Sequence, residues 1–220
     1  MQIQFKNVDF AYSNQWIFKK LNYTIEGDKV IGIFGSNGSG KTTLGKLIMG
    51  ILPCDGGSIT IDGKTINTTP LWEIGERIGY LFQNPSKQLF ASTVLDEMMF
   101  PFVLKGKSVD GLKKRCLELL GDLNLIEKAE YNQFTLSVGQ KQRLAIAALL
   151  INNPEYLILD EPTTGLDDKN KKNLLKILSD QKKDGKGMMI ISHDKNFLSE
   201  LCDEIYIVDE YTIKEGLLWN

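Results

Sequence analysis

Residues 35–42, Gly-Ser-Asn-Gly-Ser-Gly-Lys-Thr, are of the types that bind a triphosphate, and their spacing fits the P-loop pattern. Glycines let backbone N–H groups crowd around the β-phosphate, and the N-terminus of a following helix adds partial positive charge. Lys41 is expected to reach the β- and γ-phosphates, and the Thr42 hydroxyl to bind Mg²⁺. The apolar run 29–34 before the motif predicts the buried strand that such a loop needs. The motif therefore predicts a nucleoside triphosphate site.

Two acids follow an apolar run further along the chain. Residues 156–159 predict a buried strand, and Asp160 and Glu161 come directly after it. Ligands of open α/β sheets bind at the carboxyl ends of the strands. Asp160 is expected to hold Mg²⁺ through water, because Mg²⁺ keeps much of its hydration. Glu161 could orient or deprotonate an attacking water. Two acids after a strand are often only a solvated turn, and the P-loop upstream favours the functional interpretation.

His193, the only histidine, and Gln83 also stand at the ends of predicted strands. A neutral imidazole at this sheet edge could bond the γ-phosphate or hold the water. Gln83 could help to ligate Mg²⁺. Each would be unremarkable alone, but together with the acids they outline one site.

The elements that must position these residues are mostly strands and helices in alternation. Strands are expected at residues 2–5, 21–25, 29–34, 56–63, 78–82, 156–159, 188–191 and 204–208. Helices are expected between the last three, and residues 84–135 are helical in pattern, most clearly 112–120. Such alternation is typical of a parallel sheet with crossovers. The fold class expected is α/β: a P-loop NTPase with a mostly parallel sheet, an N-terminal antiparallel β-subdomain and a helical subdomain.

Composition excludes several classes of protein. A net charge of −2 and a pI near 5.6 argue against a nucleic-acid or anionic-membrane surface. Three scattered cysteines indicate a reducing cytosol. The longest apolar stretch, 144–151, is far shorter than the ~20 residues that span a bilayer. Polar residues break up the N-terminus, so no signal peptide is expected. Another subunit would have to bring this protein to a membrane.

Residues 136–140, Leu-Ser-Val-Gly-Gln, precede a helical run, and Ser137 is well suited to cap that helix. With this loop added to the motifs above, the chain resembles the ATP-binding-cassette (ABC) ATPases over essentially its whole length. The motifs occur in that family's order: 10–12, the P-loop, Gln83, the signature loop 136–140, the acidic pair, 165–167 and His193. Seven elements in the right order and spacing make chance an unlikely explanation.

The resemblance implies that two cassettes face each other head to tail, with each ATP enclosed by one P-loop and the partner's signature loop. Glu161 would be the catalytic base, aided by Lys41, Gln83 and His193, and Asp167 would couple the two sites. ATP would be contacted by Tyr12, Asn37, Gly38, Ser39, Gly40, Lys41, Thr42 and Thr43, and the partner's ATP by Ser137, Gly139 and Gln140. The metal ligands would be Thr42, Gln83 and Asp160. Tyr12 would stack on adenine, with Trp16 as a rival.

Val138 departs from the family's signature, which has glycine at this position. One interpretation is a tolerated substitution with a negative φ. The other is that its β-branched bulk impairs the composite site that this loop completes, within an asymmetric heterodimer.

Residues 82–97 resemble the cassettes of energy-coupling-factor importers, which take up vitamins or transition-metal ions. There Asp96 and Glu97 would meet basic side chains on helices of a membrane subunit. The apolar floor of that groove would be Leu89, Phe90, Val94 and Met98, although these could equally pack the helical subdomain.

The resemblance thus implies an ATP-hydrolysing subunit of a membrane importer, on the cytoplasmic side of the cell membrane and peripheral to it. Its partners would be a second, preferably different, cassette and a transmembrane coupling subunit, without nucleic acid and without direct membrane insertion. Residues 1–220 would form a single ABC ATPase domain, with a helical subdomain at about 84–150. Another transporter class (multidrug, lipid or peptide) and a soluble non-transport cassette are the alternatives.

Overall fold

Two β-sheets organise the computed structural model, which describes residues 1–106 and 111–216. The larger sheet has the strand order β10-β9-β3-β8-β7-β6 and is parallel except for β10. The smaller sheet, β2-β1-β4-β5, is antiparallel. The strands are β1 (Gln2–Tyr12), β2 (Gln15–Glu26), β3 (Val30–Phe34), β4 (Gly56–Ile61), β5 (Lys64–Thr65), β6 (Ile78–Leu81), β7 (Tyr156–Asp160), β8 (Gly187–Ile191), β9 (Glu204–Asp209) and β10 (Thr212–Gly216). The predicted fold class is confirmed.

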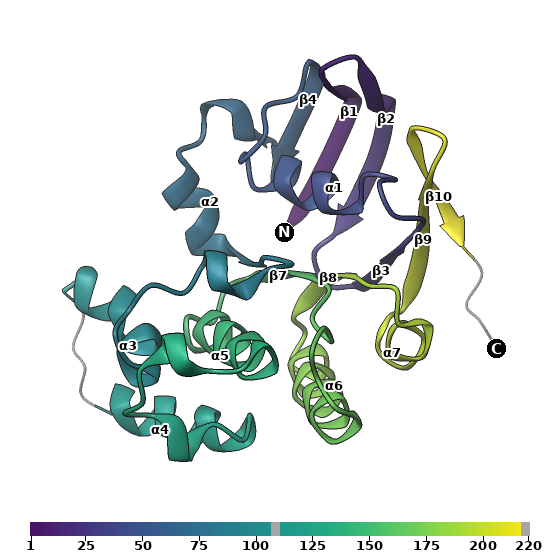
Figure 1. The fold of residues 1–220 in the computed structure, drawn as a ribbon. Helices are drawn as coiled ribbons and strands as arrows, with labels where there is room; N and C mark the ends of the chain where they lie inside the picture. The colour runs from purple at the N-terminus through teal and green to yellow at the C-terminus, as the bar shows by residue number, and fades with distance from the viewer. Residues whose placement is uncertain (107–110, 217–220) are drawn as a thin grey trace.

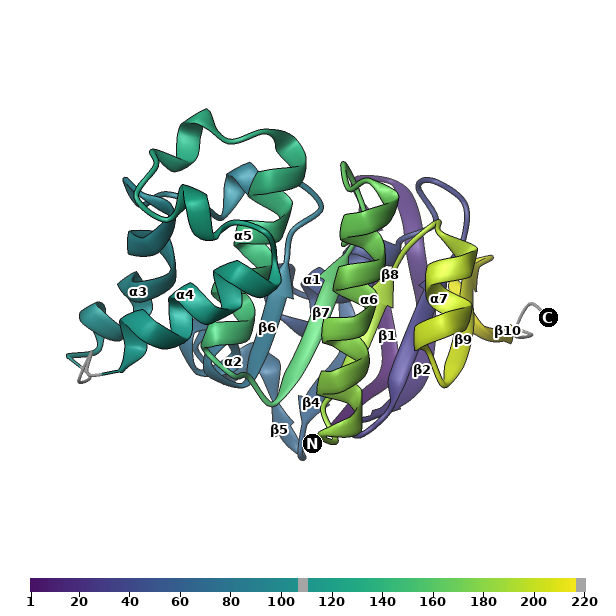
Figure 2. The ribbon, with the colours of Figure 1, turned by 90° about the horizontal axis from the view of Figure 1, so that it is seen from below.

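Seven helices connect the strands within the described ranges. They are α1 (Lys41–Ile48), α2 (Leu71–Arg77), α3 (Val94–Leu104), α4 (Leu112–Asp122), α5 (Val138–Ile151), α6 (Asp168–Lys183) and α7 (Lys195–Leu201), with short 3₁₀ turns at 66–68, 85–87, 126–128 and 133–135. In Figure 2, α3, α4 and α5 gather beside the large sheet, and α6 and α7 lie across it. The amphipathic helix predicted at 112–120 is confirmed: α4 buries Leu112, Cys116 and Leu120.

Alternate residues of the central strands enter two different cores, because side chains of a strand point to opposite faces. In β8, Met188 and Ile190 pack with α5, α6 and α7, whereas Met189 and Ile191 pack with α1 and the antiparallel sheet. Figure 1 shows these two layers on opposite sides of the large sheet. Both faces are covered, so the central strands are continuously apolar, as expected for a buried parallel sheet.

The N-terminal strands are longer than the predicted segments 2–5 and 21–25. β1 and β2 form one long hairpin whose register shifts, with Asn7 and Lys20 at positive φ. These polar residues interrupt the apolar alternation, and the hairpin accommodates them as bulges. Neither α2 nor β10 was predicted from the sequence. α2 buries only Ile74, and β10 is an edge strand with exposed Lys214 and Glu215.

Arg77, at the end of α2, joins two parts of the fold. Its guanidinium lies 2.6 Å from both Asp62, after β4, and Glu155, before β7. Hydrogen bonds from Arg77 hold the pKa of each carboxyl below its usual range.

None of the helices in residues 1–106 and 111–216 is long and apolar enough to cross a bilayer.

Candidate active site

The carboxyl ends of β3, β6, β7 and β8 meet at one edge of the large sheet, beside the end of β1. A pocket of about 510 Å³ opens there. It is lined by Tyr12, Gln15, Ile17, Asn37, Gly38, Gly40, Lys41, Thr42, Thr43, Gln83, Asp160, Glu161 and His193. The structure therefore brings together the residues expected to serve this chain's own nucleotide, except Ser39, which lines the adjoining groove.

The P-loop turns through glycines that take backbone conformations rarely adopted by other residues: φ is +80° at Gly38 and +108° at Gly40. A Cβ on Gly40 would lie 2.4 Å from Cγ2 of Ile17 in β2, so the loop rests directly on the antiparallel sheet. Gly40 precedes α1 and has no side chain to cap it, which leaves first-turn N–H groups available to an anion.

Lys41 is buried beneath the loop, where its Nζ donates to the carbonyls of Gly35 (2.9 Å) and Ser36 (2.8 Å). Burial lowers the pKa of Lys41, while the nearby carboxylates of Glu161 and Asp160 act in the opposite direction. The lysine thus lies directly under the loop that would surround the phosphates.

Asp160 is almost completely buried at the end of β7. Thr42 Oγ1 donates to its Oδ2 at 2.7 Å, and Oδ1 has no hydrogen-bond partner within the described part of the chain. Burial raises the pKa of Asp160. A buried carboxylate with a free oxygen beside a threonine hydroxyl is an all-oxygen donor set of the kind Mg²⁺ prefers. Across the described ranges no three His, Cys, Asp or Glu residues form a metal-holding cluster.

Glu161 is held in a left-handed backbone conformation, with φ at +52°. Its largely buried carboxylate lies 3.6 Å from His193 Nε2, and its other oxygen lies 3.5 Å from Ser192 Oγ. His193 is about half-exposed and faces the pocket. A carboxylate fixed at the pocket wall in this way can accept a proton from a water beside the phosphates.

The two residues that could stack on adenine line different hollows of the surface. Tyr12 lines the pocket, with its OH 3.3 Å from Thr43 Oγ1 and its ring edge-on to Phe10. Trp16 lines the neighbouring groove, with Lys19 Nζ 5.4 Å from its ring centroid. The geometry favours Tyr12 as the adenine partner.

The signature residues lie outside this pocket, at the N-terminus of α5. Ser137 caps the helix, and Gln140 reciprocates: Gln140 N donates to Ser137 Oγ (3.3 Å), and Ser137 N donates to Gln140 Oε1 (2.9 Å). Gly139 packs against the loop before α6, where an added Cβ would lie 2.2 Å from Gly165 O. Asp167 caps α6 through Asn170 N at 2.8 Å.

Val138 is the first residue of α5 and is 61% exposed. Its φ is not positive, so the backbone needs no glycine here. This agrees with the interpretation of a tolerated backbone, while the effect of the exposed side chain on a partner's nucleotide stays a hypothesis.

The prediction of a docking groove after Gln83 is wrong for most of the residues assigned to it. Leu89, Val94 and Met98 are buried in the core, and only Phe90 is exposed. Glu97 is also buried, and its Oε2 accepts the N–H groups of Phe90 (2.9 Å) and Ala91 (2.7 Å). A buried carboxylate that accepts two N–H groups of its own loop does not face a partner's basic side chain.

Sequence reasoning missed Gln142, a fully buried glutamine on α5 whose Nε2 donates to the backbone carbonyl of Glu161 at 3.1 Å. The sequence pattern that could have indicated it is a polar residue on the apolar face of a helix, the face that also carries Ala145 and Ile146.

Comparison with known proteins agrees with this geometry. The family model described as "ABC transporter" matches residues 18–164. An energy-coupling factor transporter ATP-binding protein, EcfA1, of Fusobacterium nucleatum is 37% identical over 96% of this chain and 80% of its own. The structure of cbiO1 from Clostridium perfringens, part of the ABC transporter complex cbiONQ, superposes with a TM-score of 0.83 at 32% identity, over 97% of this chain and 87% of that one. A dimeric ATP-binding cassette in a post-hydrolysis state with ADP and Pi gives a TM-score of 0.87 at 28% identity, over 99% of both. The chain belongs to the ABC transporter family, as an ATP-binding and ATP-hydrolysing subunit.

Proposed function

We propose that this chain powers an energy-coupling-factor importer of a vitamin or a transition-metal ion. It works at the cytoplasmic face of the membrane, paired with a second, unlike cassette and docked on a transmembrane coupling subunit. Two comparisons support this assignment: a relative named as an energy-coupling factor ATP-binding protein and a structural neighbour from the cbiONQ complex. We further propose that residues 1–220 form one ATPase domain with a helical subdomain at about 84–150.

Each ATP is sandwiched between two chains in this proposal. The observation that carries it is the separation of the signature loop from this chain's own pocket. Ser137, Gly139 and Gln140 therefore serve the nucleotide held by the partner's P-loop. The comparison with a dimeric cassette bound to ADP and Pi supports the same arrangement.

Hydrolysis proceeds by in-line attack of water on the γ-phosphate. Glu161 orients this water and takes its proton. His193, which lies next to Glu161, bonds the γ-phosphate. Lys41 binds the β- and γ-oxygens, and Tyr12 stacks on adenine. Thr42, Gln83 and Asp160 would hold Mg²⁺, which supplies positive charge to the phosphate oxygens. Closure of the pair around ATP drives the membrane partner, and hydrolysis resets it.

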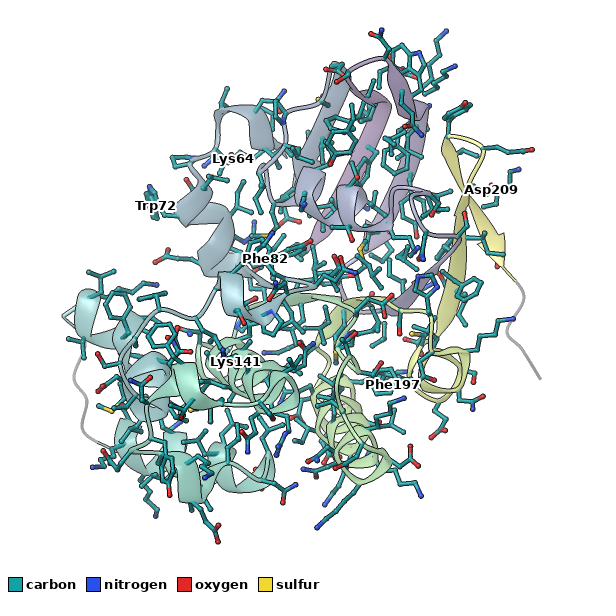
Figure 3. All side chains as sticks on the ribbon, viewed as in Figure 1. Lys64, Trp72, Phe82, Lys141, Phe197 and Asp209 are labelled. Carbon is teal, nitrogen blue, oxygen red and sulfur yellow. The ribbon has the colours of Figure 1, made fainter. Side chains whose placement is uncertain are left out.

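A different surface replaces the groove expected for the membrane subunit. Exposed apolar side chains stand on α2 and α3 and just before α3: Leu71, Trp72, Phe90, Phe100, Val103 and Leu104. Figure 3 shows Trp72 projecting from α2. The two helices are adjacent, because Lys105 at the end of α3 lies 2.9 Å from Glu76 of α2. Exposed apolar side chains on these two helices are suited to contact a coupling helix.

Purification of the tagged Glu161→Gln chain from detergent-solubilised membranes with ATP and Mg²⁺ tests the assignment. This variant should bind ATP, fail to turn it over, and trap the closed pair. We expect a second, different cassette and two unlike membrane proteins to co-purify. Val103→Asp in the same background should lose the membrane proteins and keep the cassette.

Other results would overturn the assignment. One membrane protein with only this cassette would indicate a conventional transporter. Absence of any membrane partner would indicate a soluble cassette, and wild-type turnover by Glu161→Gln would refute its role as the base.

A further inference from the structure

Gln142 is a buried glutamine whose side-chain amide bonds the backbone of Glu161. Its side chain is fully buried on α5, and Nε2 donates to the carbonyl of Glu161 at 3.1 Å. Its Oε1 is also buried but has no partner among residues 1–106 and 111–216. A buried, unpaired amide oxygen destabilises the fold, whereas an apolar side chain of the same shape would not. Fold stability therefore does not account for a glutamine at this position.

The bond falls on a backbone segment that needs support. Glu161 has a φ of +52°, a conformation that costs energy for any residue with a side chain and persists only where its surroundings impose it. Its N–H donates to Ile191 O at 2.8 Å, and its carbonyl also accepts from Thr164 N at 3.2 Å. The first of these bonds is made by the neighbouring strand β8, and the second by the turn that follows Glu161. Gln142 adds a third support from a different element.

That element begins at the signature loop. α5 starts at Val138, directly after its cap Ser137, and Gln142 follows one turn later. The helix that presents Ser137 and Gly139 to the partner's nucleotide therefore also holds the backbone of Glu161, which serves this chain's own nucleotide. The position of the Glu161 carboxylate depends on how α5 sits.

We propose that Gln142 is a positioning residue for hydrolysis: through its bond to the Glu161 carbonyl, α5 sets the place of the Glu161 carboxylate. This inference rests on the proposed role of Glu161 as the base. Gln142 itself lies outside the pocket and touches no reacting atom.

Gln142→Met tests the proposal, because methionine keeps the length of the side chain and removes both the donor and the unpaired oxygen. The matched control is Gln133→Met. Gln133 is equally buried, with its Nε2 unpartnered, but it lies on the 3₁₀ turn at 133–135 in the helical subdomain. Both variants are compared with wild type in the full chain and in the complex recovered with its membrane partners. The measurements are melting temperature, ATP affinity, and kcat and KM for ATP.

For Gln142→Met we expect an unchanged or higher melting temperature, unchanged ATP affinity and KM, and a kcat lower by roughly 10- to 100-fold, the scale of a small misplacement of a catalytic group. Gln133→Met should keep wild-type kcat. In a Glu161→Gln background, Gln142→Met should leave ATP binding and the trapped closed pair unchanged, because its effect passes through the Glu161 carboxylate.

Three results would overturn the proposal. The first is wild-type kcat for Gln142→Met, and the second is loss of ATP binding or of the closed pair in the double variant. The third is a fall in kcat matched by an equal loss of folded protein, which would make Gln142 structural. If instead Glu161→Gln itself turns over ATP normally, the assignment of the base fails, and that outcome is seen independently of Gln142.

Discussion

Replacement of Gly139 by alanine should cripple hydrolysis while the protein still folds. The new Cβ would lie 2.2 Å from Gly165 O, and real Cβ contacts essentially never fall below 3.0 Å. The signature loop and the loop before α6 must therefore separate by at least 3.0 − 2.2 = 0.8 Å. Misplacement of catalytic groups by about 1 Å can cost about 10²-fold in rate. We expect kcat to fall by roughly 100-fold.

The loss should come from geometry and not from unfolding. Overpacking typically costs about 1–3 kcal/mol, and a protein of this size loses about 2–4 °C in melting temperature per kcal/mol. Phosphate release at saturating ATP and a thermal melt of the same sample therefore separate the two effects.

Gly121→Ala is the matched control. Gly121 lies inside α4, where an added Cβ would meet only Ile126 Cδ1, at 3.9 Å. Alanine is favoured over glycine in a helix by roughly 0.5–1 kcal/mol, so this variant should melt a few degrees higher and keep full turnover. If Gly139→Ala instead hydrolyses ATP at more than half the wild-type rate, the packing of these two loops has no part in catalysis and the reasoning is refuted.

Three further predictions concern other parts of the molecule. Lys41→Ala should lose most ATP binding in a fluorescent-nucleotide titration, and unchanged affinity would contradict its role. Tyr12→Ala should weaken ATP binding by roughly 5- to 150-fold, the range of base–aromatic stacking, whereas Trp16→Ala should change it little; the reverse order would move adenine to the neighbouring groove. Arg77→Met should cost about 1 kcal/mol or less near neutral pH, because its partners are partly exposed. Both partner carboxyls have lowered pKa values in the fold, so their contribution exists above the ordinary carboxyl pKa of about 4 and disappears as the pH falls further. The difference in melting temperature between wild type and Arg77→Met should therefore shrink on acidification, and a constant difference would contradict this account.

The gathering of the site residues could be predicted because each follows a buried apolar strand. Asp160, His193 and Gln83 end segments that are continuously apolar, and the carboxyl ends of parallel strands share one edge. The sequence therefore indicated the neighbours of the P-loop without any knowledge of distances.

It was less predictable which side chains are buried and which groups they bond. An apolar residue such as Met98 fits a docking groove or a core equally well in sequence, and only packing decides between them. Glu97 looked like a surface charge because its backbone partners lie in a loop whose path the sequence does not specify. The bond of Gln142 to Glu161 joins elements that are distant in the chain, so no local pattern could reveal it.

The contact of Gly40 with Ile17 carries a consequence for genetics. Ile17 belongs to the hairpin of the antiparallel sheet, well apart in sequence from the P-loop, yet its Cγ2 fills the space where Gly40 would carry a Cβ. A larger or polar residue at position 17 would push on the turn that precedes Lys41. In a screen for loss of transport, substitutions at Ile17 should group with those at Gly40, and second-site suppressors of one should arise at the other.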